Sequence, residues 1–262
     1  MATVIGVDAS NFACKQYYGD REHDAGQCML AKFNGARMLF PDAVIYLAFD
    51  TKPPTFRHEL YPEYKGNRRW NPDDRKKIHD ALDYVKFHSR NAGLIVVEAP
   101  GHEADDVLAS LARQCRMRRE TVHLVSEDRD FYTLLMYDGI RLWKFIESKG
   151  IRGYGLEVIL TGETTESDIV KKFDVECWQW IDFRCMCGDS SDNIKGLNGY
   201  GPKRSRLILQ SFDSLDKMYS NWDEFRAWFS DEDANKLDQF RKELPTLRRL
   251  FRMVDNLDVI RH

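Results

Sequence analysis

Residues 122–130 read Val122-His123-Leu124-Val125-Ser126-Glu127-Asp128-Arg129-Asp130, a short apolar run followed at once by acidic residues. Two other apolar runs have the same form, since 4–7 is followed by Asp8 and 43–49 by Asp50. Continuous apolar runs such as these, and another at 94–97, are typical of strands that are buried on both faces. Helix-like stretches lie between them, so the sequence predicts an α/β fold with a mostly parallel sheet flanked by helices.

Nine acidic residues follow these runs or lie in a later polar segment. The carboxyl ends of parallel strands meet at one edge of a sheet, where clustered carboxylates need a compensating cation. Acids in a first helical turn often only complement the helix dipole, but that reading does not explain the acids at strand ends. Carboxylate oxygens suit Mg²⁺ or Mn²⁺, and nine exceed the needs of one ion. We therefore expect two ions, about 4 Å apart, able to activate water and to stabilise the leaving oxygen of a phosphodiester. The predicted ligands are Asp8, Asp50, Glu103, Asp105, Asp106, Asp128, Asp130, Asp189 and Asp192.

Two basic segments suit a nucleic-acid partner. Residues 196–204 are glycine-rich, with Pro202 placed to open a helix whose N-terminal N–H groups, with Lys203 and Arg204, can meet a phosphate. Residues 56–69 mix aromatic and basic side chains, which stack on unpaired bases and grip phosphates. A solvated loop is the alternative for 56–69. Asn71 and Pro72 then predict the start of a helix, which Ile78, Leu82 and Val85 continue, and a further strand is expected at 140–145.

Composition sets the remaining bounds. The 262 residues, of which 43% are hydrophobic, can build one large α/β domain with a smaller appended lobe. The formal net charge of −3 conceals an excess of basic over acidic residues outside the nine carboxylates. The six cysteines are expected to be free thiols, because the chain shows neither a secretion signal nor an apolar run of about 20 residues. We therefore expect a cytoplasmic protein without membrane contact.

Four segments, 56–69, 101–106, 126–130 and 188–203, resemble in their order the motifs of the 5′-nuclease superfamily. This superfamily comprises flap endonucleases, bacteriophage 5′→3′ exonucleases and the 5′-nuclease domain of bacterial DNA polymerase I. The resemblance runs from Asp8 to about residue 212. It implies a PIN-like catalytic core in 1–170 with a helical arch in 51–92. It also implies a helical C-terminal lobe in 171–262, with a helix-three-turn-helix DNA-binding element at about 186–212.

The resemblance also implies roles for residues. The second metal site would be completed by Asp130, Asp189 and Asp192, and the other six acids would serve the first. Lys65 and Arg68 match catalytic cations that contact the scissile phosphate, and Tyr64 would stack near the 5′ end. The implied DNA-binding residues are Arg57, Tyr64, Lys65, Arg68, Gly199, Gly201, Lys203 and Arg204. A K⁺ ion bound by main-chain carbonyls would use Met186, Cys187, Lys195, Leu197 and Tyr200, although Lys195 stands where many relatives have proline.

The implied activity is that of a monomeric 5′→3′ exonuclease and structure-specific 5′-flap endonuclease. Its substrate would be DNA with a 5′ flap, a nick or a 5′ end, and replication proteins would be its partners. Because no polymerase sequence follows, we expect a free-standing nuclease of the bacteriophage kind. One alternative is the removal of RNA primers from RNA–DNA hybrids by the same site. Another is a catalytically silent DNA-junction binder, which the complete carboxylate set disfavours.

Overall fold

A computed structural model of the chain describes residues 3–144 and 161–261, which form two compact units. The sheet unit comprises Met1–Thr55, Arg69–Thr165 and Val254–His262, and the helical unit comprises Phe56–Arg68 and Glu166–Met253. The predicted boundary after residue 170 stays a prediction. The basic-aromatic segment belongs to the helical unit, and the end of the chain returns to the sheet unit, so neither unit is continuous in sequence.

The sheet unit is built on a seven-stranded sheet with the order β6-β5-β4-β1-β2-β3-β7. Its five inner strands are parallel, and the two edge strands, β6 and β7, pair antiparallel with their neighbours. The predicted mostly parallel sheet is therefore confirmed, although residue 145 of the expected strand at 140–145 lies outside the described residues. The strands are β1 (Val4–Asp8), β2 (Val44–Ala48), β3 (Ile95–Glu98), β4 (Val122–Val125), β5 (Ile140–Lys144), β6 (Thr161–Thr164) and β7 (Ile260–Arg261).

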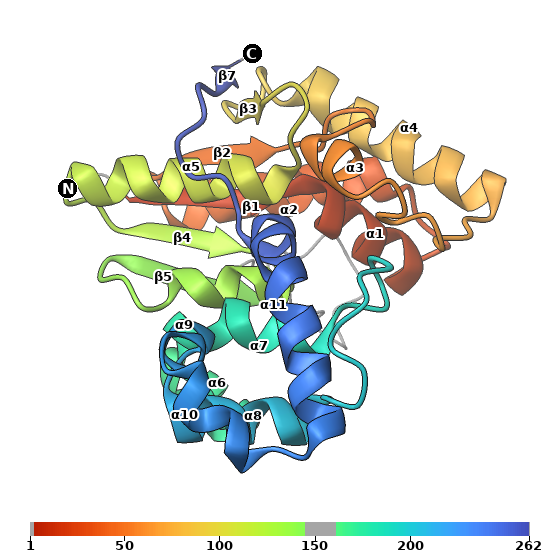
Figure 1. Ribbon diagram of the computed structural model, residues 1–262. Helices are drawn as coiled ribbons and strands as arrows, with labels where there is room; N and C mark the ends of the chain where they lie inside the picture. Colours follow the sequence, from red (N-terminus) through yellow and green to blue (C-terminus); the bar gives the residue numbers. More distant parts are fainter. Residues whose placement is uncertain (1–2, 145–160, 262) are drawn as a thin grey trace. The chain divides into compact units, whose positions relative to one another are not determined.

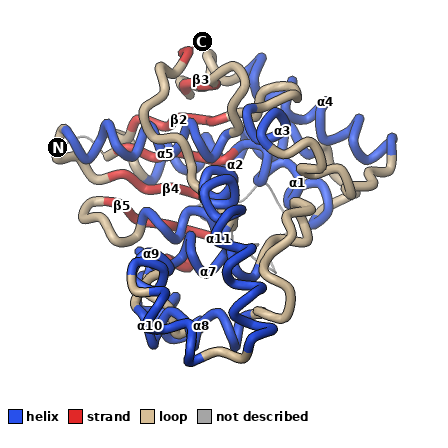
Figure 2. The backbone as a smooth tube through the Cα atoms, in the orientation of Figure 1, coloured by secondary structure: helices blue, strands red, loops and turns tan. Residues whose placement is uncertain are grey.

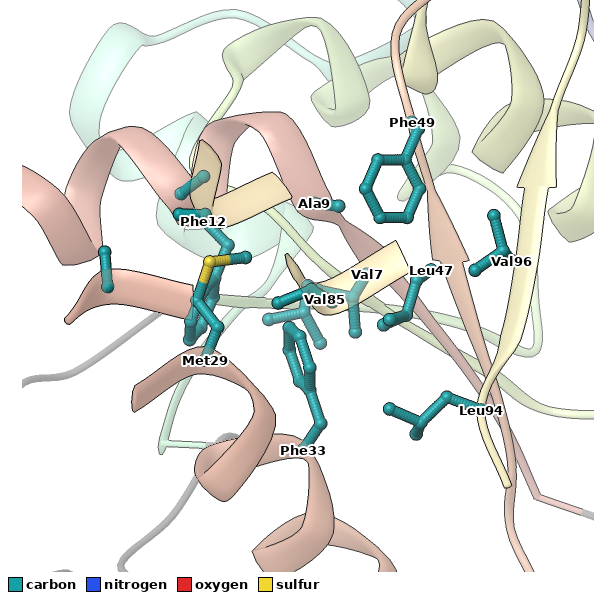
Figure 3. Packing of buried hydrophobic residues seen from close by; sticks show 14 of the residues in the cluster. Val7, Ala9, Phe12, Met29, Phe33, Leu47, Phe49, Val85, Leu94 and Val96 are labelled. Carbon is teal, nitrogen blue, oxygen red and sulfur yellow. The ribbon is translucent and has the colours of Figure 1, made fainter. Parts of the chain in front are cut away.

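Helices cover both faces of this sheet (Figure 1). The helix α5 (Ala104–Met117) packs on β1 and β4, where Gly6 makes room for it. A Cβ atom at Gly6 would lie 2.8 Å from Leu108 Cδ2, so only glycine permits this approach. The neighbours of Gly6 in β1, Ile5 and Val7, belong to the core cluster that includes residues of α1 (Ala9–Gly19), α2 (Ala25–Leu39) and α4 (Pro72–His88). Figure 3 shows Phe12, Met29 and Phe33 in this cluster with Val7 and Leu47.

The predicted helical arch in 51–92 divides into two parts that belong to different units. Its first part holds the short helix α3 (Phe56–Leu60). Its second part is α4, which begins as predicted: the side chain of Asn71 accepts the N–H of Asp73 at 2.9 Å, and Pro72 is the first helical residue. Ile78 and Val85, whose spacing predicted this helix, are buried in the core cluster. Helix α4 is therefore a layer of the sheet unit, because its apolar face packs on α1 and α2.

The helical unit contains no strand among its described residues (Figure 2). A partly buried ion pair joins helices of this unit, since Arg248 of α11 donates to both carboxylate oxygens of Asp182 in α7, at 2.8 and 3.0 Å. Asp182 also accepts the N–H of Leu215, at the start of α9. None of the described helices is both long and apolar enough to cross a membrane. The helices are α6 (Glu166–Phe173), α7 (Trp180–Cys187), α8 (Pro202–Phe212), α9 (Leu215–Ser220), α10 (Trp222–Phe225) and α11 (Asp231–Phe251).

Candidate active site

Three predicted ligands lie at the carboxyl ends of three adjacent strands of the sheet unit, in the order β4-β1-β2. Asp8 is the last residue of β1 and caps α1, accepting the N–H of Asn11 at 2.9 Å. Asp50 follows β2. Asp128 follows β4 and caps the short 3-10 helix Arg129–Leu134, accepting the N–H of Asp130 at 2.9 Å. Parallel strands therefore bring acids that are far apart in sequence to one edge of the sheet.

The negative charges at this edge act on one another. The pKa of the Asp8 carboxyl is raised from 3.8 to about 7, because burial and the negative charges of Asp50 and Asp128 outweigh the hydrogen bonds that Asp8 accepts. Ser126 restrains two of these residues, because its buried hydroxyl donates to Asp8 Oδ2 at 3.1 Å and accepts the N–H of Asp128 at 3.1 Å. Asp50 Oδ1 accepts the N–H of Ala104 at 2.8 Å, at the positive end of α5.

The acidic residues at the start of α5 differ in how deeply they are buried. Glu103 caps α5 and Asp105 is half-buried in its first turn. Asp106, in contrast, is completely buried, and its two oxygens accept the N–H groups of Val254 at 2.8 Å and Glu103 at 3.2 Å. Asp106 thus fastens residue 254 to the start of α5, which is a structural role. The expectation that Asp106 is a metal ligand stays a prediction.

The candidate ligands form only part of a metal site. Within residues 3–144 and 161–261, no three His, Cys, Asp or Glu side chains are arranged to hold a metal ion together. The chemistry of the donors nevertheless fits a hard divalent cation, because Asp8, Asp50 and Asp128 are carboxylates that repel one another. Asp189 and Asp192 belong to the helical unit, and the other predicted ligands belong to the sheet unit.

The two predicted ligands of the helical unit, Asp189 and Asp192, each form an ion pair with an arginine. Asp189 forms an ion pair with Arg184 and accepts the N–H and the hydroxyl of Ser191, at 2.8 and 2.6 Å. Burial alone would raise the pKa of Asp189, but the bonds from Ser191 and the charge of Arg184 outweigh it and lower the pKa. Asp192 pairs with Arg68 at 2.5 Å and accepts the hydroxyl of Tyr64 at 3.2 Å.

Two predicted DNA contacts are buried. Arg57 is 2% exposed and donates from Nε to the carbonyl of Leu250 at 3.0 Å, so it fastens α3 to α11. Tyr64 is 4% exposed, and its ring meets the edge of His58, with Lys65 Nζ 4.9 Å from the ring centroid. In this structure neither side chain offers a surface to a base or a phosphate. The charges of this segment are visible in the sequence and its packing on α11 is not, and the DNA contacts of Arg57 and Tyr64 stay predictions.

The glycine-rich stretch forms a tight approach of two backbone segments. Gly188 has a φ of +71°, and a Cβ atom at Gly196 would lie 2.3 Å from the carbonyl oxygen of Met186. The carbonyl of Met186 accepts the N–H of Leu197 at 2.8 Å. The carbonyl of Leu197 in turn accepts the N–H of Tyr200 at 2.9 Å. Two of the five carbonyls expected to bind K⁺ thus serve the turn, and the K⁺ site stays a prediction.

The start of α8 carries the predicted phosphate-binding groups. Gly201 caps the helix, with open space beside it, and Pro202 is its first residue. Lys203 is exposed. Arg204 lies 4.2 Å from the centroid of the Tyr200 ring and pairs with Asp233 at 2.5 Å, so it is already engaged within the helical unit.

Sequence reasoning gave no role to several polar residues that organise these sites. Ser126 links Asp8 to Asp128, and Arg184 neutralises Asp189. Asn67 and Asn193 join the basic-aromatic segment to the loop that carries Asp192. Ser126 is two residues before Asp128, and this closeness in sequence could have indicated its role. Each of the two asparagines, in contrast, has a partner more than a hundred residues away in the chain.

Comparison with known proteins agrees with this architecture. Residues 3–173 match the model of the 5'-3' exonuclease N-terminal resolvase-like domain, and residues 175–261 match the 5'-3' exonuclease C-terminal SAM fold. The chain is 32% identical to the thermostable DNA polymerase I of Thermus filiformis over 228 residues, which is 84% of this chain and 25% of that protein. It is also 32% identical to a 5'-3' exonuclease of Mycoplasma pneumoniae over 179 residues, 68% of this chain and 57% of that protein. The chain thus spans between a quarter and about three fifths of these relatives.

Solved structures of the bacteriophage T5 enzyme share the fold. A T5 5'-exonuclease with bound zinc ions superposes with a TM-score of 0.73 at 21% identity, covering 97% of this chain and 89% of that one. A T5 flap endonuclease in a pseudo-enzyme-product complex with DNA and metal ions gives a TM-score of 0.72 at 21% identity and the same coverage. The expected α/β core with a helical C-terminal part and the expected nuclease class of enzyme are confirmed at the level of the family. The family models cover nearly the whole chain, which therefore belongs to the 5'-3' exonuclease family.

Proposed function

We propose that this chain is a divalent-metal-dependent 5′→3′ exonuclease and structure-specific 5′-flap endonuclease that hydrolyses DNA phosphodiesters. The observation that carries the proposal is the set of mutually repelling carboxylates of Asp8, Asp50 and Asp128, at the ends of adjacent strands in a nuclease family. Such a set is costly to hold without a compensating cation. The T5 neighbours, one with metal ions and the other with DNA and metal ions, support the same reading.

The acids of the sheet unit would hold the first cation. Asp8, Asp50 and Asp128 provide its centre, and Glu103, Asp105 and Asp106 complete the donor set directly or through water. When bound, Mg²⁺ or Mn²⁺ ions would supply activation of water and stabilisation of the leaving oxygen. The chain itself orients the carboxylates: Ser126 holds Asp8, and the first N–H of α5 holds Asp50.

Asp130, Asp189 and Asp192 are the proposed ligands of a second cation, as expected from the sequence. Asp189 and Asp192 each now balance an arginine, Arg184 or Arg68 respectively. A cation that binds these acids must compete with the arginines, so the second site would be the weaker of the two.

The helical unit would provide the contacts to DNA. The N-terminus of α8, with Gly201 as its cap and Lys203 exposed beside it, is suited to a backbone phosphate of the duplex. Lys65 and Arg68 would stabilise the negative charge that grows on the scissile phosphate. Substrates with a 5′ flap, a nick or a 5′ end are the proposed partners.

One cleavage experiment tests this function. The full chain is incubated with a labelled 5′-flap, a nicked duplex and an RNA-primed duplex, in Mg²⁺, Mn²⁺, Ca²⁺ or chelator. We expect cleavage from the 5′ side in Mg²⁺ and Mn²⁺, and loss of at least a hundredfold in Asp128→Asn, on the order of the loss of a major transition-state contact. Asp42→Asn is the matched control, because Asp42 is exposed in the turn before β2, at the amino end of that strand and not at its carboxyl end.

The outcomes separate the alternatives. Equal cleavage by Asp128→Asn and wild type would overturn the assigned site. Faster cleavage of the RNA-primed strand than of the matched DNA strand would assign the enzyme to primer removal. Tight binding to the flap in Ca²⁺ without cleavage in Mg²⁺ or Mn²⁺ would show a silent junction binder.

A further inference from the structure

Within the helical unit, six hydrogen bonds fasten the basic-aromatic segment to the loop 190–193, one of them the bond from Arg68 Nη2 to Asp192 Oδ1 described above. We call this set the loop clasp. Two of its bonds come from asparagine side chains: Asn67 Nδ2 donates to the carbonyl of Ser190 at 2.7 Å, and Asn193 Nδ2 donates to the carbonyl of Glu63 at 2.8 Å. The other three run from Lys65 N to the carbonyl of Asp192 at 2.9 Å, from Tyr64 Oη to Asp192 Oδ2 at 3.2 Å, and from Arg68 Nε to the carbonyl of Ser191 at 3.3 Å.

The backbone on both sides of these bonds is irregular. Lys65 and Asn193 both have left-handed backbones, with φ of 55° and 59°, which is uncommon for residues other than glycine. The helix α3 ends at Leu60, and residues 61–68 follow as turns rather than as a regular element. In this stretch the N–H of Lys65 and the carbonyl of Glu63 have partners in the loop 190–193. The local structure that carries Lys65 and Arg68 is thus supported from a distant part of the sequence.

We propose that Asn67 and Asn193 are positioning residues that hold Lys65 and Arg68 in their catalytic geometry through the loop clasp. This inference rests on the proposed function of those two cations. Loop 190–193 leads into the glycine-rich turn at 196–201 and the start of α8. The clasp therefore joins the charge-stabilising cations to the duplex-binding turn, so that a duplex bound at α8 sets where Lys65 and Arg68 lie.

The test in solution compares three variants of the full chain. Asn67→Ala removes one donor, and Asn193→Gly removes the other while permitting the positive φ. Asn235→Ala is the control, because this asparagine of α11 is exposed and its side chain accepts a hydrogen bond from Arg226, at 3.4 Å, outside the clasp. On the 5′-flap substrate we expect kcat to fall about tenfold to a hundredfold in both clasp variants, as misplacement of catalytic groups requires. The duplex Kd measured in chelator should stay within about twofold of wild type, since α8 is untouched.

A double-mutant cycle shows whether the clasp acts through the cations. In a Lys65→Ala/Arg68→Ala background, Asn193→Gly should change kcat by less than about twofold, because nothing remains to be positioned. An undiminished loss in that background, a loss of duplex affinity equal to the loss of kcat, or no loss of kcat in the wild-type background would each overturn the proposal.

A second measurement does not depend on activity. Hydrogen exchange at the amide of Lys65 should be at least about tenfold faster in Asn193→Gly than in wild type and unchanged in Asn235→Ala, since exchange reports local opening. Trypsin should likewise cut after Lys65 and Arg68 sooner in the clasp variant. Unchanged exchange and unchanged cutting would refute the clasp. If wild type cleaves no 5′-ended substrate, the proposed function fails while these two readouts still decide whether the clasp exists.

Discussion

The Oγ of Ser126 donates a hydrogen bond to Oδ2 of Asp8 across 3.1 Å, which joins the end of β4 to the end of β1. The same oxygen accepts the N–H of Asp128 at 3.1 Å. Such a hydroxyl orients a candidate ligand without binding the ion itself. Residues in this position commonly affect metal affinity almost as much as the ligands do.

Replacing Ser126 by alanine should therefore weaken metal binding. We expect the affinity for Mg²⁺ to fall about tenfold to a hundredfold, measured by calorimetric titration of the chelator-treated protein. Cleavage at subsaturating Mg²⁺ should fall in parallel and recover when Mg²⁺ is raised. Ser220→Ala, at an exposed position that ends α9, is the control. Equal affinities of Ser126→Ala and wild type would show that the hydroxyl serves only the fold.

The raised pKa of Asp8 predicts how stability depends on pH in the absence of metal. The folded-state pKa of about 7 exceeds the ordinary value of 3.8, so the folded state binds the proton more tightly than the unfolded chain. The contribution of Asp8 is therefore fully present below pH 3.8 and is lost as pH rises through about 7. At about 1.4 kcal/mol per pKa unit, the loss is on the order of 4 kcal/mol. Urea unfolding in chelator at pH 4.5 and pH 8 measures it.

Asp8→Asn is the comparison that isolates this group. Its free energy of unfolding should decline less between pH 4.5 and pH 8 than that of wild type, because the amide does not ionise. Saturating Mg²⁺ should restore stability to wild type at pH 8, since a ligand that binds only the folded state stabilises it. Parallel pH profiles of the two proteins in chelator would contradict the assigned shift.

The sheet and its acidic edge could be predicted because both depend on residues that are close together in the sequence. Strands buried on two faces give unbroken apolar runs: β4 ends where its run ends, and β1 ends one residue later, at Asp8. An acid directly after such a run must lie at the strand's carboxyl end. The bond between Asp106 and Val254 could not be predicted in this way, because Val254 returns to α5 from the far end of the chain.

The basic-aromatic segment was harder to predict for the same reason. Arg57 and Tyr64 look like surface residues by composition, and only their partners, Leu250 and Asp192, show that they are interior. The pattern of Ile78 and Val85 correctly predicted a helix but could not show what its apolar face covers. Periodicity identifies a buried face, and the identity of the covering surface is a property of the whole fold.

The contrast between Arg57 and Lys203 yields a third prediction. Arg57→Met should destabilise the chain by about 2 to 4 kcal/mol, because it removes a buried donor and leaves the carbonyl of Leu250 without it. At temperatures where the variant is folded, its duplex affinity should depend on salt as wild type does. Lys203→Ala should leave stability unchanged and reduce the slope of log affinity against log salt by about one. Thermal melts and binding isotherms at several salt concentrations measure both effects. A reduced salt slope in Arg57→Met would show that Arg57 contacts a DNA phosphate.

Arg68 allows the sharpest test of the proposed chemistry, because it is paired with Asp192 and is also the proposed partner of the scissile phosphate. Arg68→Ala should lower kcat on a 5′-flap by about a hundredfold to a thousandfold, the usual effect of losing a donor that stabilises transition-state charge. KM should change much less, since the contact strengthens as charge develops. Arg68→Lys should recover part of kcat, because it restores the charge without the two-pronged geometry. Arg90→Ala, an exposed arginine just beyond the end of α4, controls for loss of surface charge. A rise in KM with kcat unchanged would mean that Arg68 binds the substrate's ground state and that its ion pair with Asp192 is the more important of its two roles.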